Sequence, residues 1–256
     1  MTAVAAATVV LLRPAGPGFE LLMIERHAAT AFAGGAMVFP GGRVDPGDAA
    51  VAADARLAHG FDGLEPVDAA ARVAAARETF EEATILLSDG PPLAHDVRAD
   101  WASRLNNGMA DYAAFLRHTG HRLDAARLTP FAHWVPPAEA AITRRFDTRF
   151  YLALLPRGEV AAPDGHEAVA VRWLTAADAV VLASAGLISL IFPTRRTLER
   201  IAQYDTMEML MRRIAAMPLV RIQPRIEQRG GTAWVIIPAG CDYPITEEPV
   251  AAARRE

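Results

Sequence analysis

The chain has 256 residues, of which 52% are hydrophobic, 22% charged and 7% aromatic. This apolar fraction excludes an intrinsically disordered chain, and the length is sufficient to bury a core without disulfide or metal staples. The 26 basic and 30 acidic residues give a net charge of −4, and no block of one sign predicts a nucleic-acid or membrane surface. The chain contains no Lys, so its basic residues are Arg, whose planar side chain suits bidentate binding of phosphate.

Three features of the sequence bear on the compartment. The apolar N-terminus, residues 1–12, lacks the basic start and cleavage signature of a secretory signal. The longest uncharged stretch, residues 179–192, is shorter than the roughly 20 residues that a membrane span needs. Cys241 is the single cysteine and suits a reducing compartment, where we interpret it as a small buried hydrophobe. We therefore expect a soluble, cytoplasmic protein.

The first third of the chain predicts a hairpin followed by a long helix. Residues 4–13 and 19–26 have the composition of buried strands, and the Pro- and Gly-rich residues 14–18 between them form a turn. A short apolar run at 36–39 ends at Pro40-Gly41-Gly42. Residues 68–87 are Ala-rich and contain no Gly or Pro, so they predict a helix that Asp68 caps. Its buried face is predicted to hold Val73, Ala76, Phe80, Thr84 and Leu87.

The rest of the chain mixes the two kinds of element. Residues 96–117 predict one or two helices with an interruption near 106–108, and 129–135, 146–155 and 169–173 predict strands. Helices are expected at 176–185 and 194–217, and a strand pair around Gly230-Gly231 within 220–238. Met207, Met209 and Met211 on the second helix indicate packing in the core or in a homodimer. This pattern predicts one layered α/β or α+β domain spanning residues 1–256.

Three glutamates stand close together in the long predicted helix. In the segment Arg77 to Glu82, the side chains of Glu78, Glu81 and Glu82 fall in one narrow sector of the helix surface. Carboxylates at these spacings repel one another unless a cation lies among them. Hard oxygen ligands of this kind suit Mg²⁺ or Mn²⁺. A solvated acidic face with a surface ion pair to Arg77 is the alternative interpretation.

A glycine-rich turn precedes this helix. Phe39-Pro40-Gly41-Gly42 is followed by Arg43-Val44-Asp45-Pro46-Gly47-Asp48. Two consecutive glycines allow a sharp turn and a close approach of the backbone to a ligand. A carbonyl at this turn is a candidate ligand of the same metal ion, and an ordinary β-turn is the alternative.

Taken together, the turn and the helix resemble the Nudix hydrolase family. The family box reads G-x5-E-x7-R-E-U-x-E-E-x-G-U, in which U is a bulky apolar residue. Here Gly42 is followed after five residues by Asp48, and Arg77-Glu78 and Glu81-Glu82 supply the core of the second half. The resemblance implies an α/β/α sandwich with a mixed sheet.

The match departs from the family box at four points. Asp48 replaces Glu, Thr79 replaces the bulky apolar residue, and Thr84 replaces the glycine, so that we expect the helix to continue through position 84. The 28 residues 49–76 also separate the halves where the box has seven. An insertion of this size costs little entropy when its ends keep their geometry. We place the insertion at about 49–70, with residues 59–63 as a surface excursion, and a helical C-terminal extension at about 190–256.

A split box of this kind resembles the coenzyme A diphosphatase branch of the family. The segment Leu22 to Arg26, then Gly35 and then Phe39-Pro40-Gly41-Gly42 match the spacing of that branch's upstream motif. His27 stands where Ser is usual and Ala31 where a second Arg is usual, which weakens the phosphate site that the motif provides. Residues 144–150 and 192–194 also look like that branch.

The resemblance implies a role for each matching residue. The metal ligands are Gly42, through its carbonyl, Glu78 and Glu82, and the ion is Mg²⁺ or Mn²⁺. Arg77 orients the carboxylates, and the general base is Glu81 or Glu167, the second of which lies in a predicted loop. Substrate contacts are expected from Arg26, Gly35, Phe39 and Arg145. Arg144 and Arg149 are further candidates for phosphate contacts, whereas His133 and His166 have no partner at metal-ligand spacing.

Three functions are consistent with these residues. The first is metal-dependent hydrolysis of the diphosphate of coenzyme A or acyl-CoA, which yields 3′,5′-ADP and a phosphopantetheine product. The second keeps the chemistry but acts on ADP-ribose or a dinucleotide, as the missing upstream Arg suggests. The third is a Nudix-fold nucleotide-binding regulator without turnover, which the mutually repelling carboxylates argue against. In each case the partner is a small diphosphate compound, with no nucleic acid or membrane.

Overall fold

A mixed sheet forms the centre of the molecule. The computed structural model describes residues 3–29, 33–138 and 145–253. The sheet has the strand order β10-β2-β1-β9-β8-β11, with β3 paired to β2 and β4 paired to β1. Its strands are β1 (Val4–Ala15), β2 (Gly18–Arg26), β3 (Met37–Val38), β4 (Gly41–Arg43), β8 (Thr129–Trp134), β9 (Phe146–Leu154), β10 (Ala168–Leu174) and β11 (Arg221–Ile222). The hairpin β1–β2 is antiparallel, whereas β1 and β9 run parallel from Val4↔Phe146 to Leu12↔Leu154.

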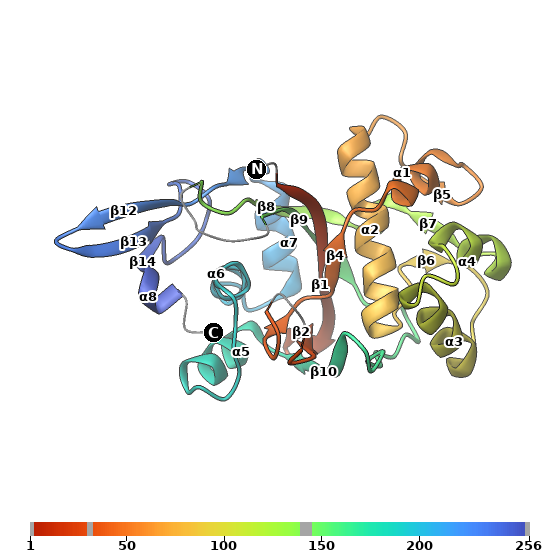
Figure 1. Cartoon of the computed structure of the whole chain (residues 1–256), viewed down its shortest axis with the longest axis horizontal. Coiled ribbons are helices and arrows are strands. Elements are labelled where there is room, and N and C mark those ends of the chain that lie inside the picture. The colour runs from red at the N-terminus through yellow and green to blue at the C-terminus, as the bar shows by residue number, and fades with distance from the viewer. Residues whose placement is uncertain (1–2, 30–32, 139–144, 254–256) are drawn as a thin grey trace.

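Helices cover both faces of this sheet, as an α/β/α sandwich requires (Figure 1). One face carries α1 (Pro46–Ala53), α2 (Pro66–Ala83), α3 (His95–Asn106) and α4 (Tyr112–Thr119). The other carries α5 (Ala176–Ser184), α6 (Phe192–Ile201) and α7 (Met207–Ala215). The alternation of strand side chains feeds both cores, because Val9 and Leu11 of β1 face α2 whereas Val10 and Leu12 face α6 and α7. The predicted fold class is confirmed.

Two small sheets lie outside the main one. Strands β5 (Ala58–His59), β7 (Arg122–Asp124) and β6 (Ser88–Asp89) form the first, and a 3₁₀ turn, Ala125–Arg127, follows β7. Strands β12 (Arg225–Arg229), β13 (Thr232–Ile236) and β14 (Glu247–Pro249), with the short helix α8 (Val250–Ala253), form the second. The predicted strand pair around Gly230-Gly231 is confirmed as β12 and β13. The C-terminal extension predicted at about 190–256 therefore contains this strand pair as well as helices.

The first half of the insertion in the box forms regular structure and packs in the core. It contains α1 and β5, and its residues Val51, Leu57 and Ala58 are buried in the first core. The intervening residues 60, 62 and 63 are exposed, which confirms a surface excursion in the middle. The buried residues of the insertion pack against the same core as α2, so the first half of the insertion stays close to the helix that carries the second half of the box. No helix in these described ranges is long and apolar enough to cross a membrane.

The long helix differs from its prediction at both ends. It begins at Pro66, which suits the first helical position, so Asp68 lies in the first turn and does not cap. Asp68 instead accepts a hydrogen bond from the hydroxyl of Tyr151 at 2.7 Å and pairs with Arg72. The helix ends at Ala83, because Thr84 adopts the left-handed conformation with φ of 57°. The expectation of a helix that continues past Thr84 is wrong.

The expected single helix at 194–217 is two helices. Helix α6 ends at Ile201, and α7 begins after Thr206, whose hydroxyl accepts a hydrogen bond from the backbone N–H of Met209 at 3.2 Å. This cap satisfies one of the free N–H groups at the start of α7 and separates the two helices. Both pack in the second core through Leu198, Ile201, Leu210 and Ile214.

Candidate active site

The candidate site forms where the last turns of α2 meet the glycine turn between β3 and β4. Strand β4 pairs with β1 through Thr8↔Gly41, Ala7↔Gly42 and Ala6↔Arg43, which places the glycines on the sheet. The hydroxyl of Thr8 donates to the carbonyl of Pro40 at 2.6 Å and fixes the turn. Helix α2 packs against β1 and β4, so the sheet presents Gly41 and Gly42 to its acidic face.

Two glutamates of α2 contact these glycines directly. A Cβ at Gly42 would lie 2.4 Å from the carboxyl carbon of Glu78, so no larger residue fits there while Glu78 keeps its place. The backbone N–H of Gly41 donates to Oε2 of Glu82 at 2.8 Å. Glu78, Glu82 and the Gly42 backbone are therefore brought together, as the family resemblance implies.

Arg77 joins both halves of the split box. Its guanidinium donates to the two carboxylate oxygens of Asp48 at 3.0 and 3.1 Å, and to the carbonyl of Arg43 at 2.8 Å. It also donates to Glu78 at 2.8 Å and to Glu81 at 3.0 Å. Asp48 is 2% exposed, and its side chain also accepts a hydrogen bond from the Asp45 N–H at the start of α1. Asp48 therefore meets the arginine although it is one methylene shorter than the usual Glu.

The site contains more acid than base. Six carboxylates surround the two guanidinium groups of Arg77 and Arg26, namely those of Asp45, Asp48, Glu78, Glu81, Glu82 and Glu167. Burial and then the neighbouring charge of Glu78 raise the pKa of Glu81 to about 8, although Arg77 opposes the shift. Burial also raises the pKa of Glu78, and it raises the pKa of Glu82 well above its ordinary value.

These residues fit a divalent cation. Burial raises the pKa of Glu78 and Glu82 although Arg77 and Arg26 lie beside them, and both carboxylates lie against a glycine turn that leaves room for no side chain. Oxygen donors are the ligands that Mg²⁺ and Mn²⁺ prefer. A separate group, His59, Asp89 and Asp124 of the small β5-β7-β6 sheet, brings ligand atoms within 4.8 Å of one another. Arg127 already pairs with Asp89 there, and the group contains no residue of the box.

Arg26 and Glu167 complete the site from the strand side. Arg26 ends β2 and reaches Glu82 at 3.4 Å and Glu167 at 3.3 Å, both long for ion pairs. Its buried Nε atom has no hydrogen-bond partner within the described part of the chain. Glu167 is attached beside it, because the His27 N–H donates to the Glu167 carbonyl at 2.8 Å, while the Glu167 side chain is 60% exposed. Arg26 therefore keeps one buried donor unused and makes only long ion pairs to Glu82 and Glu167 among the described residues.

The other predicted substrate residues lie in different surroundings. Gly35 has φ of 77° and donates its N–H to the Arg26 carbonyl at 3.0 Å, which closes the turn after β2. Phe39 is 3% exposed, and its ring packs in the second core. Arg145 donates to the carbonyls of Pro136, Pro137 and Ala138, and no described contact joins it to the carboxylates. Arg144 and Ala31 lie outside the described residues.

The loop before Glu167 also contacts the end of α2, which the sequence did not reveal. The Ala162 N–H donates to the carbonyl of Ala83 at 3.0 Å, and the Asn106 side chain reaches the carbonyl of Glu81 at 3.4 Å. Asn106 also donates to Asp164 at 2.9 Å. The Asp164-Gly165 dipeptide is a recognisable turn signal, but nothing in the sequence connects it with Asn106.

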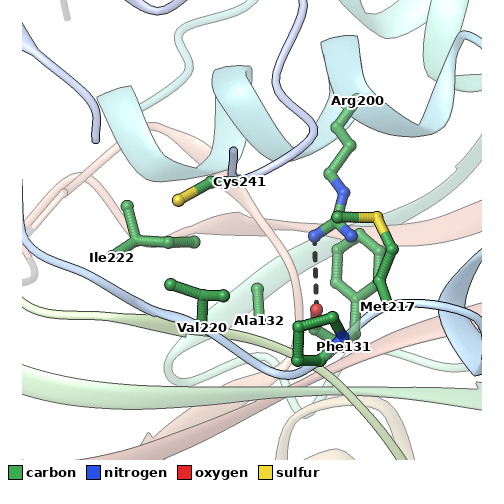
Figure 2. A pocket seen from close by; sticks show the side chains of 8 residues that line it. Phe131, Ala132, Arg200, Met217, Val220, Ile222 and Cys241 are labelled. Carbon is green, nitrogen blue, oxygen red and sulfur yellow. Dashed lines mark hydrogen bonds between the residues drawn. The ribbon is translucent and has the colours of Figure 1, made fainter. Parts of the chain in front are cut away.

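A small pocket lies elsewhere, between β8, β11 and the C-terminal extension (Figure 2). It is lined by Phe131, Ala132, Arg200, Met217, Pro218, Val220, Ile222 and Cys241. Arg200 donates to the Phe131 carbonyl at 3.2 Å across it, and Cys241 is a buried free thiol whose pKa burial raises. None of the predicted site residues lines this pocket. The prediction that Cys241 is a small buried residue is confirmed.

Known proteins resemble this chain in sequence and in fold. The family model described as the NUDT19 Nudix domain matches residues 51–201, which is more than half of the chain. Human acyl-coenzyme A diphosphatase NUDT19 is 29% identical over 209 residues, which cover 65% of this chain and 56% of the human protein. The Caenorhabditis elegans putative nudix hydrolase 7 is 29% identical over 184 residues, which cover 72% of this chain and 56% of that protein. The chain thus matches little more than half the length of these relatives.

A solved structure supports the assignment. The crystal structure of a Nudix hydrolase from Alicyclobacillus acidocaldarius superposes with a TM-score of 0.72 at 28% identity, covering 85% of this chain and 99% of that chain. Together with the Arg77-centred box, these similarities show that the chain belongs to the Nudix hydrolase family, in the group that the NUDT19 Nudix domain defines.

Proposed function

We propose that this chain hydrolyses the diphosphate bond of coenzyme A or an acyl-CoA with the aid of Mg²⁺ or Mn²⁺. The products are 3′,5′-ADP and the corresponding phosphopantetheine. The observation that carries the proposal is the excess of buried carboxylates at the glycine turn. Arg77 bonds to Glu78 and Glu81, while Glu82 bonds to Gly41 and Glu78 packs against Gly42. The substrate class is supported by the relatives from Homo sapiens and Gallus gallus, which are named acyl-coenzyme A diphosphatases.

The chain's residues divide the work of the reaction. Glu78, Glu82 and the Gly42 carbonyl hold the cation, which when bound neutralises the diphosphate and lowers the pKa of a water. Arg77 keeps the carboxylates in place, because without it their mutual repulsion spreads them. Arg26 binds a substrate phosphate through its guanidinium, because its ion pairs to Glu82 and Glu167 are long and its Nε has no partner among the described residues. Arg145, Gly35 and Phe39 remain candidates for substrate contacts, the last two through the turns that they form.

We assign the general base to Glu167 and keep Glu81 as the alternative. Glu81 is held by Arg77 at 3.0 Å, and a pKa of about 8 leaves it protonated at neutral pH in the absence of a cation. Glu167 is exposed and lies beside Arg26, so it can reach a water that attacks phosphorus. Loss of a general base lowers the rate by about 10²–10⁴-fold. Glu167→Gln and Glu81→Gln, compared under the same conditions, decide between the two.

Product analysis tests the proposed reaction. The purified protein is incubated with Mg²⁺ or Mn²⁺ and a panel of CoA esters, ADP-ribose and NADH, and the nucleotide products are identified. Glu82→Gln should abolish hydrolysis, whereas Glu208→Gln, on an exposed glutamate of α7, should not change it. Release of 3′,5′-ADP from CoA compounds supports the proposal, and intact CoA esters with both metals refute it.

ADP-ribose or a dinucleotide is the second candidate substrate. Position 31 holds Ala where the coenzyme A motif has a second Arg, so the phosphate site of that motif is incomplete. Under this alternative AMP is released from ADP-ribose faster than 3′,5′-ADP from any CoA ester. Tight nucleotide binding without any product would instead indicate a regulator.

A further inference from the structure

The position of Glu167 depends on one side chain in its own loop. Asp164 accepts three hydrogen bonds: from the Ala168 N–H at 2.8 Å, from the Glu167 N–H at 3.2 Å, and from the Asn106 side chain at 2.9 Å. The first two close a turn within the loop, and the Gly165 N–H strengthens it by donating to the Ala168 carbonyl at 3.0 Å. A side chain that caps its own loop in this way restricts the backbone on which Glu167 stands.

The third bond connects this loop with the catalytic helix. Asn106 is the last residue of α3, and its amide nitrogen contacts both Asp164 and the carbonyl of Glu81. That carbonyl belongs to the last turn of α2, where carbonyl groups lack partners within the helix. Asn106 therefore links the turn that holds Glu167 to the turn that holds Glu81 and Glu82.

Backbone hydrogen bonds attach the two ends of the loop to neighbouring elements, and the bond between Asn106 and Asp164 attaches its middle. Ala162 is bonded to α2 through the Ala83 carbonyl, and the Glu167 carbonyl is bonded to His27 at the end of β2. Between them, Asp164 is the residue whose side chain is bonded both to the loop backbone and to another element. The separation of Glu167 from the carboxylates of α2 is thus set by the exposed Asn106 and the half-buried Asp164 together with Ala168, which is buried in the first core and pairs with Arg26.

We propose that Asn106 and Asp164 form a positioning pair that holds Glu167 at its working distance from the carboxylates of α2. The inference rests on the proposed role of Glu167 in diphosphate hydrolysis. Neither residue touches the reacting atoms, so the pair acts through Glu167. Misplacement of a catalytic group by about 1 Å costs on the order of 10²-fold in rate. Because the pair acts on the position of Glu167 and contacts no substrate group, the effect falls mainly on kcat.

The variants are chosen to separate positioning from folding. Asn106→Ala and Asp164→Ala each remove one member, and Asp164→Asn keeps one oxygen for the Ala168 N–H but turns a donor toward Asn106. The matched control is Asn107→Ala, because Asn107 is also exposed at the end of α3, and within the described ranges its side chain donates to Ser103 alone. Glu167→Gln and the double variant Asp164→Ala with Glu167→Gln complete the set.

Steady-state kinetics give the first readout. We expect Asp164→Ala and Asn106→Ala to lower kcat by about 10–100-fold with a smaller change in KM, because the substrate contacts remain intact. Asp164→Asn should fall between wild type and Asp164→Ala, and Asn107→Ala should match wild type. In the Glu167→Gln background, Asp164→Ala should have no further effect. An unchanged kcat in Asp164→Ala, or an equal loss in both backgrounds, overturns the proposal.

Two results separate this proposal from the proposed function. If Glu167→Gln is fully active while Asp164→Ala is impaired, hydrolysis stands but neither the base assignment nor the positioning of Glu167 does. If wild type cleaves none of the substrates, hydrogen exchange of the Glu167 and Ala168 amides decides. Faster exchange in Asp164→Ala and Asn106→Ala than in Asn107→Ala supports the pair, and equal exchange in all variants overturns it.

Discussion

Both carboxylate oxygens of Asp48 accept hydrogen bonds from the guanidinium of Arg77, at 3.0 and 3.1 Å. The two residues are 29 positions apart in the sequence and stand on either side of the insertion. Both side chains are buried, so this pair is the joint between the halves of the box. Burial by itself lowers the pKa of Arg77. The carboxylates of Asp48, Glu78 and Glu81 outweigh that effect and raise the pKa above its ordinary value, so the guanidinium keeps its charge.

Removal of Asp48 should therefore destabilise the fold. Asp48→Ala leaves part of the Arg77 charge without its partner, and breaking a buried pair in this way costs about 3 kcal/mol. We expect the free energy of unfolding, measured by urea denaturation, to fall by about that amount. Asp54→Asn serves as the control, because the ion pair that the described residues give Asp54 is with the exposed Arg56, two positions away in the sequence. Equal stability of Asp48→Ala and wild type would contradict the role of this joint.

A methyl group at Gly42 should disable the site without unfolding the protein. The added Cβ would lie 2.4 Å from the carboxyl carbon of Glu78, so that side chain must move away from the turn. We expect Gly42→Ala to lower kcat/KM by about 10²-fold or more, since it displaces a proposed ligand. Gly47→Ala is the matched control: Gly47 lies in α1 with no atom within 4 Å of an added Cβ. That change should leave activity intact and stabilise α1 by about 0.5–1 kcal/mol. Wild-type activity in Gly42→Ala would speak against the proposed ligand set.

Metal binding should release protons and strengthen as pH rises. Burial raises the pKa of Glu81 to about 8 and raises those of Glu78 and Glu82 as well. The Glu81 carboxyl therefore holds a proton at neutral pH, and the shifts of Glu78 and Glu82 act in the same direction, whereas a cation binds the deprotonated forms. The apparent affinity for Mn²⁺ should thus increase between pH 6 and 8. Calorimetry in buffers of different ionisation enthalpy measures the protons released, and Glu81→Gln should reduce their number. Affinity that is independent of pH would show that these groups are already ionised.

Replacement of Thr84 by glycine should stabilise the protein. Thr84 has φ of 57°, a conformation that costs a residue with a Cβ roughly 1–2 kcal/mol. Its buried hydroxyl has no hydrogen-bond partner among the described residues. We expect Thr84→Gly to raise the free energy of unfolding by about 0.5–1 kcal/mol, after the larger entropy of glycine in the unfolded chain is subtracted. Thr84→Ala separates the two causes, because it removes the hydroxyl and keeps the strained backbone. A glycine variant less stable than the alanine variant would contradict this account.

The sequence predicted elements whose signals are local. The β1–β2 hairpin, the break between α3 and α4 and the β12–β13 pair were each marked by Gly, Pro or Asn between apolar runs, and all three are confirmed. The spacing of Glu78, Glu81 and Glu82 sufficed to place them on one face, because a helix fixes those angles.

The wrong predictions depended on contacts between distant residues. Nothing near Thr84 predicts a helix end, since the end is stabilised from elsewhere: Glu159 accepts the Leu86 N–H at 2.8 Å, and Arg98 reaches the Thr84 carbonyl at 3.3 Å. These partners lie 14 or more positions from the residues that they hold. The link from Asn106 to Asp164 is hidden for the same reason. A homodimer, a cytoplasmic location and a single domain stay predictions.

The joint between Asp48 and Arg77 also affects how the chain can vary in length. Because that pair holds positions 48 and 77 together and Val51, Leu57 and Ala58 are buried before the stretch between β5 and α2, that stretch spans two anchored points. Doubling the length of such a stretch adds only about 0.6 kcal/mol of closure entropy. The exposed Asp62 and Gly63, which lie between the half-buried Phe61 and Leu64, therefore form a site at which a peptide tag or a reporter module can be inserted into the middle of a catalytic motif while its two halves stay in register.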